Sequence, residues 1–200
     1  MKTTIKTLLS TSLIAFALSS SLSVTNVSAI EKKPDAIIKI SAFKRISVKG
    51  NVEVTLIQRD QPGISYGDDN TGTAKVMQNG DNLKIISTST EKTKLNVYVS
   101  DFYRIEASEN AVVKTEGKLI TKYLQIFLKG NAQAEINTYS EGLYTVISDH
   151  ADLKLSGSTD NHTLVMGKSP KLTIDKFAAL KTDISSIDTD AVEQELAAIK

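Results

Sequence analysis

Apolar and polar residues alternate in the second half of the chain, and the alternation itself repeats. Four stretches between residues 103 and 174 place apolar side chains at every second position, which is typical of strands with one buried face. Ala111, Ala132, Ala151 and Pro170 hold equivalent positions and recur about every 20 residues. Such a repeat indicates a solenoid, because each unit buries its apolar face only against its neighbours. We therefore predict an all-β protein, a β-solenoid or β-helix with one coil for roughly every 20 residues.

Residues 30–100 show the same alternation less regularly and are predicted to be the strand-rich N-terminal part of the solenoid. Segment 43–56 resembles the later coils and precedes them by nearly three repeat lengths, so about two further coils are expected in between. Turn-forming residues at 67–70 and 79–82 predict hairpin-like excursions. The regular coils are predicted for residues 101–188.

The two ends of the chain differ from the coils. Residues 1–29 combine a basic start, an apolar and Ser-rich stretch and the small residues of Val27-Ser28-Ala29, which predicts a cleaved signal peptide rather than a membrane span. Residues 189–200 have an acidic start and carry apolar residues at helical spacing, which predicts a short terminal helix that must dock to persist. The mature protein is expected to be exported, to the periplasm or to the cell surface and medium.

Charge and composition narrow the partners. The 24 basic and 23 acidic residues give a net charge of +1, and loss of Lys2 and Lys6 with residues 1–29 leaves −1. A near-neutral chain with three arginines lacks the basic footprint of a nucleic-acid binder, so no nucleic acid is expected. The chain has no cysteine, so stacked strands must hold the fold without disulfides.

Residues that could carry catalysis are few. His150 and His162 are the two histidines, too few for a zinc site, and His162 is expected at a strand edge. Carboxylates gather in a turn and near the carboxyl end: Asp68 with Asp69, and Asp183 with Asp188 and Asp190. Turn and helix-start chemistry explains both groups, although paired carboxylates leave a polysaccharide-cleaving enzyme as the alternative. We predict no catalytic residue, no cofactor and no metal.

Asparagine recurs at the corner between the two strands of a coil. The corner sequences are Gly50-Asn51-Val52, Glu109-Asn110-Ala111, Gly130-Asn131-Ala132 and Asp149-His150-Ala151. Asparagine accepts left-handed backbone angles, and its amide can hydrogen-bond to turn backbone. A structural ladder is therefore predicted, formed by Asn51, Asn110, Asn131 and His150.

An apolar stripe is expected on the outside of the first strand of each coil. Phe127, Val146 and Val165 recur there with the period of the coils. Soluble proteins seldom leave such a stripe uncovered unless it binds something. The terminal helix, the N-terminal half or a partner could cover it, and the amphipathic tail favours internal packing.

Three motifs together resemble the head GIN domain family, described as autotransporter-adhesin head domains of otherwise unknown function. They are Phe43-x-x-Ile46-x-Val48-x-Gly50-x-Val52-x-Val54, then Asn79-Gly80-Asp81-Asn82-Leu83-Lys84-Ile85, then serial units such as Lys129-Gly130-Asn131-Ala132. The resemblance covers roughly residues 40–175 and implies an exported, non-enzymatic β-solenoid associated with the surface or envelope. Glu109 and Asp149 stand where the family pattern has glycine, and the helix-like tail replaces its closing strand.

The sequence thus favours an exported, non-enzymatic binding or scaffold protein, adhesin-like at the cell envelope and not membrane-spanning. Its partner is left open among an envelope component, a glycan and another protein. The alternative is a carbohydrate-active enzyme acting on polysaccharide with paired carboxylates.

Overall fold

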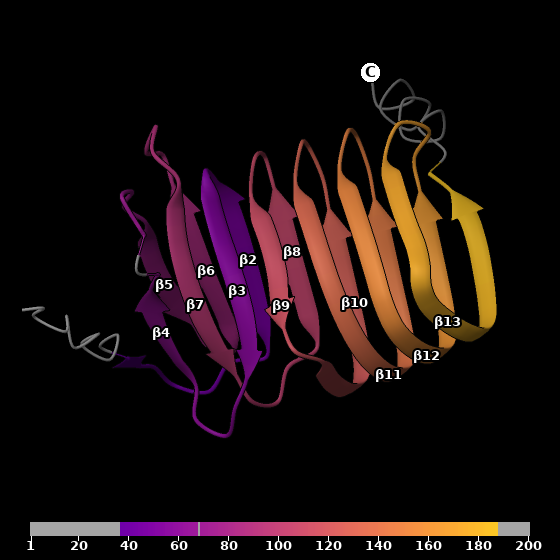
Figure 1. The fold of residues 1–200 in the computed structure, drawn as a ribbon, viewed down its shortest axis with the longest axis horizontal. Helices are drawn as coiled ribbons and strands as arrows, with labels where there is room; N and C mark the ends of the chain where they lie inside the picture. Colours follow the sequence, from indigo (N-terminus) through magenta and orange to yellow (C-terminus); the bar gives the residue numbers. More distant parts are fainter. Residues whose placement is uncertain (1–36, 68, 188–200) are drawn as a thin grey trace, which may run out of the picture. The chain divides into compact units, whose positions relative to one another are not determined.

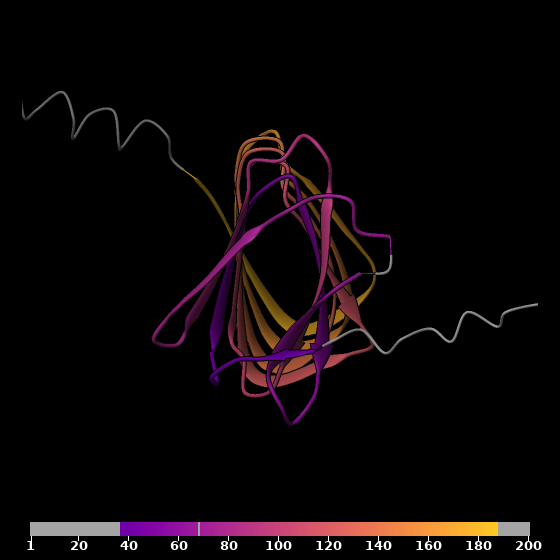
Figure 2. The ribbon, with the colours of Figure 1, turned by 90° about the vertical axis from the view of Figure 1, so that its left-hand side faces the viewer.

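The computed structural model describes residues 37–67 and 69–187. All helical or extended elements assigned within these residues are β-strands, and none is a helix. These strands form one mixed, 13-stranded sheet that curls around a core as a half-barrel (Figures 1 and 2). The all-β prediction is confirmed. In chain order the strands are β1 (Ile38–Lys39), β2 (Arg45–Gly50), β3 (Val52–Gln58), β4 (Gly63–Tyr66), β5 (Lys75–Asn79), β6 (Asn82–Ser87), β7 (Thr93–Val99), β8 (Arg104–Ser108), β9 (Val112–Glu116), β10 (Leu119–Leu128), β11 (Gln133–Ile147), β12 (Asp152–Met166) and β13 (Lys171–Ser186).

The repeat length read from the sequence matches the register of the parallel strands, because residues one repeat apart pair with each other. Ile105 of β8 pairs with Ile126 of β10, and Leu128 of β10 pairs with Ile147 of β11. In each pair the second residue lies one repeat, about 20 residues, further along the chain. β11 and β12 continue this register along their length, and a bulge between Lys154 and Ser156 shifts it at β13. Each long strand bends once, so it contributes to both walls of the curled sheet (Figure 2).

The core consists of the side chains at alternate positions that point into the curl. Leu124, Ile126 and Leu128 of β10 are each at most 2% exposed, whereas Gln125 and Phe127 between them face outward and are half-buried. Burying one such aliphatic side chain stabilises the fold by about 1.5–3 kcal/mol. The stacked columns therefore account for a fold that has no disulfide.

The coil formed by β2 and β3 lies directly beside the regular coils. β2 pairs with β8, and Val54 of β3 pairs with Val113 of β9, although the two valines lie far apart in the sequence. β6 and β7 stack on the opposite side of β2 and β3. The prediction of about two intervening coils is therefore wrong.

The physical reason is that two antiparallel pairings reverse the chain between β3 and β7. β4 pairs antiparallel with β7, and β5 forms a hairpin with β6 around the predicted turn, in which Asn79 pairs with Asn82. These reversals allow β6 and β7 to occupy the free edges of β2 and β3. The hairpin predicted at 79–82 is confirmed, whereas the turn at 67–70 does not join two paired strands, since β4 pairs with β1 and β7.

His162 is buried, so its predicted place at a strand edge is wrong. It lies within β12, is 4% exposed, and its Nε2 is 3.1 Å from Oγ1 of Thr145 on the neighbouring strand. Its ring meets Phe177 of β13 edge-to-face at 5.5 Å. Burial lowers the pKa of the imidazole because the charged form loses hydration. The alternating register explains the position, since His162 pairs with the buried Leu143.

β13 ends the stack of described strands and pairs only with β12 among them. Its apolar side chains are correspondingly open, with Ile174 47% and Ile184 72% exposed. The predicted signal peptide at 1–29 and helix at 189–200 lie outside the described residues, as do Asp68, Asp188 and Asp190.

Candidate functional site

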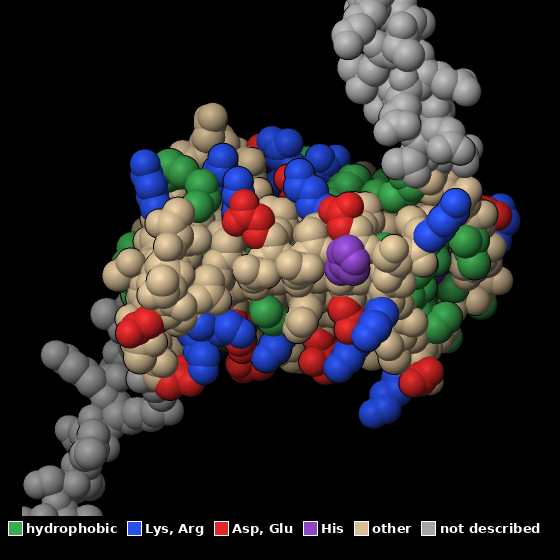
Figure 3. All heavy atoms as spheres, turned by 90° about the horizontal axis from the view of Figure 1, so that it is seen from above, with side chains coloured by type: hydrophobic (Ala, Val, Ile, Leu, Met, Phe, Trp, Pro, Cys, Tyr) green, Lys and Arg blue, Asp and Glu red, His purple; other side chains and the backbone are tan. Residues whose placement is uncertain are grey.

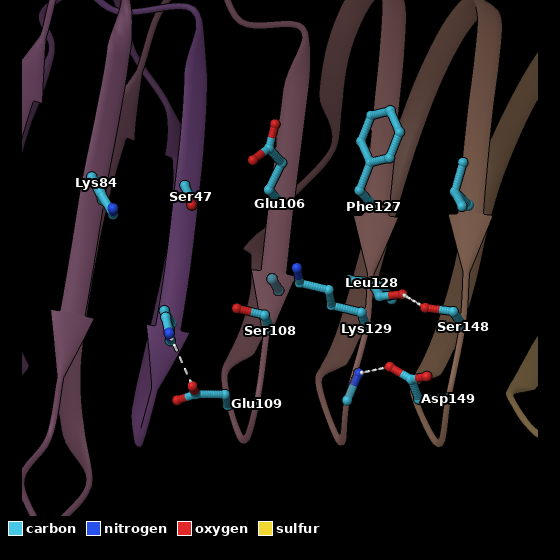
Figure 4. Close-up of a pocket in the computed structure, with 14 residues that line it drawn as sticks. Ser47, Lys84, Glu106, Ser108, Glu109, Phe127, Leu128, Lys129, Ser148 and Asp149 are labelled. Atoms are coloured by element: carbon cyan, nitrogen blue, oxygen red, sulfur yellow. Dashed lines mark hydrogen bonds and ion pairs between the residues drawn. The ribbon is translucent and has the colours of Figure 1, made fainter. Parts of the chain in front are cut away.

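A groove of about 630 Å³ lies on the outer face of β6, β2, β8, β10 and β11 (Figure 4). Parallel pairing in register creates it, because outward side chains of neighbouring strands align in rows across the sheet. Most of its lining is polar or charged, with small side chains between larger ones. The lining comprises Ser47, Lys49, Lys84, Glu106, Ala107, Ser108, Glu109, Phe127, Leu128, Lys129, Gly130, Val146, Ser148 and Asp149.

One row of side chains runs along the whole groove. Ser47 pairs with both Lys84 and Glu106, and Phe127 pairs with both Glu106 and Val146. Figure 4 shows the labelled members of this row, Lys84, Ser47, Glu106 and Phe127, on successive strands. With about 4.8 Å between strands, five positions span about 19 Å. The groove is thus long enough for several units of an extended ligand.

An aromatic cluster borders one end of the row. The half-buried ring of Phe127 lies 5.8 Å from that of Tyr144, tilted by 55°. The guanidinium carbon of Arg104 lies 5.0 Å from the centre of the Phe127 ring. Arg104 also donates to Oε1 of Gln125 at 2.7 Å, which holds the guanidinium against the ring. Phe127 is therefore a fixed apolar contact among lining residues that are mostly polar or charged by number.

The structure places the predicted stripe in one register row, since Phe127 pairs with Val146 and Val146 with Val165. Phe127 and Val146 line the groove, whereas Val165 lies one strand beyond it. The described N-terminal strands β2 and β6 continue this face side by side instead of lying over it. Sequence reasoning missed this polar continuation, because only the observed coil order brings Lys84 into the row.

Each acidic group of the groove already has a partner. Nζ of Lys49 lies 3.1 Å from Oε1 of Glu109, and Nη1 of Arg104 donates to Oε1 of Glu106 at 3.4 Å. Oδ2 of Asp149 accepts a hydrogen bond from the backbone N–H of Gly130 at 2.7 Å. In Figure 4 dashed lines mark the pairs that Glu109 and Asp149 make.

Two lysines of the groove remain unpaired. Within the described residues, Lys84 and Lys129 make neither an ion pair nor a side-chain hydrogen bond. The lining holds three basic and three acidic side chains. Lys84 and Lys129 leave two positive charges available to a ligand, beside the Asp149 carboxylate, whose partner is a neutral backbone N–H.

The corners next to the groove adopt left-handed backbone at the residue that precedes each predicted ladder position. Glu109 (φ 61°) and Asp149 (φ 58°) share this conformation with Gly50 (φ 88°) and Gly130 (φ 71°). A residue with a Cβ is strained there by about 1–2 kcal/mol. The contacts of Glu109 and Asp149 described above offset part of this cost, so the two departures from glycine keep the same corner geometry.

The left-handed residue at each corner is thus the one before the asparagine or histidine. The tolerance of asparagine for left-handed backbone angles, which is one reason for predicting the ladder, therefore does not apply. Nδ2 of Asn131 donates to Oδ1 of Asn110 at 3.3 Å, and Nδ2 of Asn51 donates to the Thr90 carbonyl at 3.0 Å. The side chain of His150 is exposed, and its backbone N–H donates to the Gly130 carbonyl at 2.9 Å. A structural role for these four residues remains a prediction.

Some charged side chains outside the groove also form ion pairs. Glu53 lies between Lys114, at 2.9 Å, and Lys92, at 3.7 Å, and the hydrogen bond from Lys114 lowers the pKa of the Glu53 carboxyl. Asp69 pairs with Lys94, and Asp183 with Lys181. On the face in Figure 3, acidic and basic side chains are interspersed.

Two further features are absent from the part of the chain that the structure describes. It contains no group of three or more His, Cys, Asp or Glu placed to hold a metal. It also contains no helix long and apolar enough to cross a membrane.

The family model described as "Putative auto-transporter adhesin, head GIN domain" matches residues 42–187. This chain belongs to the head GIN domain family. The resemblance inferred from the three motifs is confirmed, and the match includes all five strands that form the groove of this head GIN domain. None of the curated proteins matches the chain.

Solved structures share the fold of this head GIN domain. A "putative adhesin" from Bacteroides fragilis is 18% identical, with a TM-score of 0.64 over 75% of this chain and 74% of that chain. A "putative adhesin" from Parabacteroides distasonis is 11% identical, with a TM-score of 0.56 over 76% and 77%. A "putative lipid binding protein" from Parabacteroides distasonis is 13% identical, with a TM-score of 0.54 over 75% and 76%.

Proposed function

We propose that this head GIN domain protein is an exported, non-enzymatic β-solenoid that acts as an adhesin-like binding protein at the cell envelope. The groove across β6, β2, β8, β10 and β11 is its ligand site. Family membership supports the adhesin-like role, and the signal-like residues 1–29 support export. The observation that carries the proposal is a groove that combines an aromatic contact, small hydroxyl residues and unpaired lysines.

Phe127 is the central contact of the proposed site. Partly exposed aromatic side chains contribute a large share of binding energy because they combine a large contact area with little rotamer freedom. Its neighbours Arg104 and Tyr144 fix the ring before a ligand arrives, which lowers the entropy lost on binding. The predicted stripe is thus a binding surface in this proposal, and the core below it provides a rigid support.

The remainder of the proposal concerns the parts of the chain. Residues 30–100 and 101–188 together form the solenoid that presents the groove, and residues 189–200 form a short terminal helix. The carbohydrate-active enzyme is less well supported. The carboxylates that line the groove are Glu106, Glu109 and Asp149, and they are engaged by Arg104, Lys49 and the Gly130 N–H. Asp69 and Asp183 pair with lysines on β7 and β13 and do not line the groove.

Phe127→Ala tests the site. Mature protein, residues 30–200, is applied to an array of immobilised glycans and to an envelope fraction, and the Kd of the strongest binding is measured. We expect Phe127→Ala to weaken that binding at least about tenfold, since loss of a central aromatic contact costs about 2 kcal/mol or more.

Tyr139→Ala is the matched control, because Tyr139 is 53% exposed on β11 and does not line the groove. It should change the Kd by less than about twofold, as expected for a residue outside the contact. Equal binding by wild type and Phe127→Ala, with both folded by circular dichroism, would place the ligand elsewhere and contradict the proposal.

A further inference from the structure

We infer that the ligand of the groove is an anionic saccharide chain that crosses the strands, with its acidic groups bound by Lys84 and Lys129. The inference rests on the proposed function and adds the chemical class of the ligand. Three features of the groove carry it: its two unpaired lysines, the serine hydroxyls in its lining, and the pairing of its strands.

The two lysines without an acidic partner favour a negatively charged ligand. Lys49 and Arg104 are engaged by Glu109 and Glu106, whereas Lys84 and Lys129 have no acidic partner among the described residues. Lys84 lies on β6, and Lys129 directly follows β10, so two strands separate them. At about 4.8 Å per strand the two lysines lie about 14 Å apart along the row direction. A ligand with one isolated acidic group cannot reach both, but a chain with repeated acidic groups can.

The polar part of the surface suits a saccharide. Ser47 on β2 and Ser108 at the end of β8 lie in the lining, so their hydroxyls can donate to and accept from sugar hydroxyls. Ser148, which directly follows β11, donates to the Leu128 carbonyl at 3.5 Å and can still accept from a sugar hydroxyl. Of the apolar lining, Leu128 and Ala107 are 2% exposed, which leaves Phe127 and Val146 as accessible apolar contacts. Phe127 and Val146 can contact the apolar face of a sugar ring, and the lysine side chains add their CH₂ stems to this contact.

The pairing of the strands disfavours an extended peptide. A peptide usually binds a sheet by adding a strand at an unpaired edge. β2, β8 and β10 each have a strand on both sides, so their backbone groups are already bonded within the sheet. A ligand must therefore lie on the side chains, as a saccharide chain does.

The test measures binding of two oligosaccharides of equal length by the mature protein. One is an oligogalacturonate, which carries a carboxylate on every sugar, and the other is a neutral dextran oligosaccharide. We expect the oligogalacturonate to bind at least about tenfold more tightly at low salt, and its binding to weaken as salt screens the lysines.

Lys84→Gln combined with Lys129→Gln should weaken oligogalacturonate binding about tenfold and leave the thermal stability unchanged. The control is Lys118→Gln combined with Lys176→Gln, which removes the same charge from exposed lysines that make no ion pair within the described residues and lie outside the groove. This control should change binding by less than about twofold.

Each other outcome overturns the inference in a recognisable way. If dextran and oligogalacturonate bind equally and the lysine variants have no effect, while Phe127→Ala still weakens glycan binding, the anionic ligand is wrong and the proposed function stands. If oligogalacturonate does not bind, but phosphatidylglycerol vesicles bind and the Lys84→Gln, Lys129→Gln variant weakens that binding, the surface recognises a lipid headgroup instead. If neither the lysine variants nor Phe127→Ala alter any binding, the inference and the proposed groove both fail.

Discussion

Gly50→Ala is expected to destabilise the fold by about 3–5 kcal/mol, because it combines overpacking with an unfavourable backbone conformation. Gly50 ends β2 at φ 88°, and a Cβ at this position would lie 1.9 Å from the carbonyl oxygen of Ser87. That oxygen belongs to the strand beside β2, so it cannot move without separating β2 from β6. Chemical denaturation of the mature variant measures this loss. It is a large share of the roughly 5–15 kcal/mol by which a typical domain is stable against unfolding.

Gly80→Ala is the matched control for Gly50→Ala. Gly80 also has a left-handed backbone, at φ 56°, but no other atom lies within 4 Å of the place that an alanine Cβ would take. The change should therefore cost only the backbone strain, about 1 kcal/mol. Similar losses for the two variants would show that the close approach of β2 and β6 at Gly50 is not present in solution.

Leu128→Asp is expected to lower the free energy of unfolding by at least about 4 kcal/mol, because an aspartate in the core would be a buried charge without a partner. Leu128 is 2% exposed in the core column of β10. Asp152→Asn, on the outward row of β12, should change stability by less than about 1 kcal/mol. Thermal unfolding of the two variants compares them directly. A small loss for Leu128→Asp together with a larger one for Asp152→Asn would mean that the faces are exchanged, as a register slip of one residue would cause.

Alternation and spacing are sufficient to predict the strands and their register in the second half. The buried column through Leu128 and Ile147 follows from period-2 alternation, and the pairing of these two residues follows from the repeat of the coils. Local pattern is also sufficient for the hairpin around Gly80, whose turn residues are specific. These features depend on residues close in sequence or on an unbroken repeat.

The order of the N-terminal coils cannot be predicted in this way. β2 lies between β6 and β8. The alternation of residues 45–50 shows that this segment is a strand, but it does not specify which strands pair with its two edges. Sequence neighbours usually lie side by side in a sheet, so the expected order is the sequential one. The wrong prediction for His162 has a different cause, because the polarity of histidine favours an edge whereas its position in the register is buried.

Only one part of the groove lining can be predicted from the sequence. Phe127 and Val146 belong to the regular coils, and their spacing identifies them. Ser47 and Lys84 join them only because β6 and β2 stack next to β8, which requires the three-dimensional order of the coils. The acidic partners that leave Lys84 and Lys129 unpaired likewise become visible only when side-chain positions are known.

The most direct test of the proposed binding site is a map of the ligand contacts on the protein in solution. Oligogalacturonate is titrated into ¹⁵N-labelled mature protein, and the backbone amide shifts are followed by NMR. Shifts should concentrate at the groove, on the amides of Ser47, Lys84, Ser108, Phe127 and Lys129. Shifts confined to another surface, such as the exposed residues of β13, would contradict the assignment of the groove as the binding site.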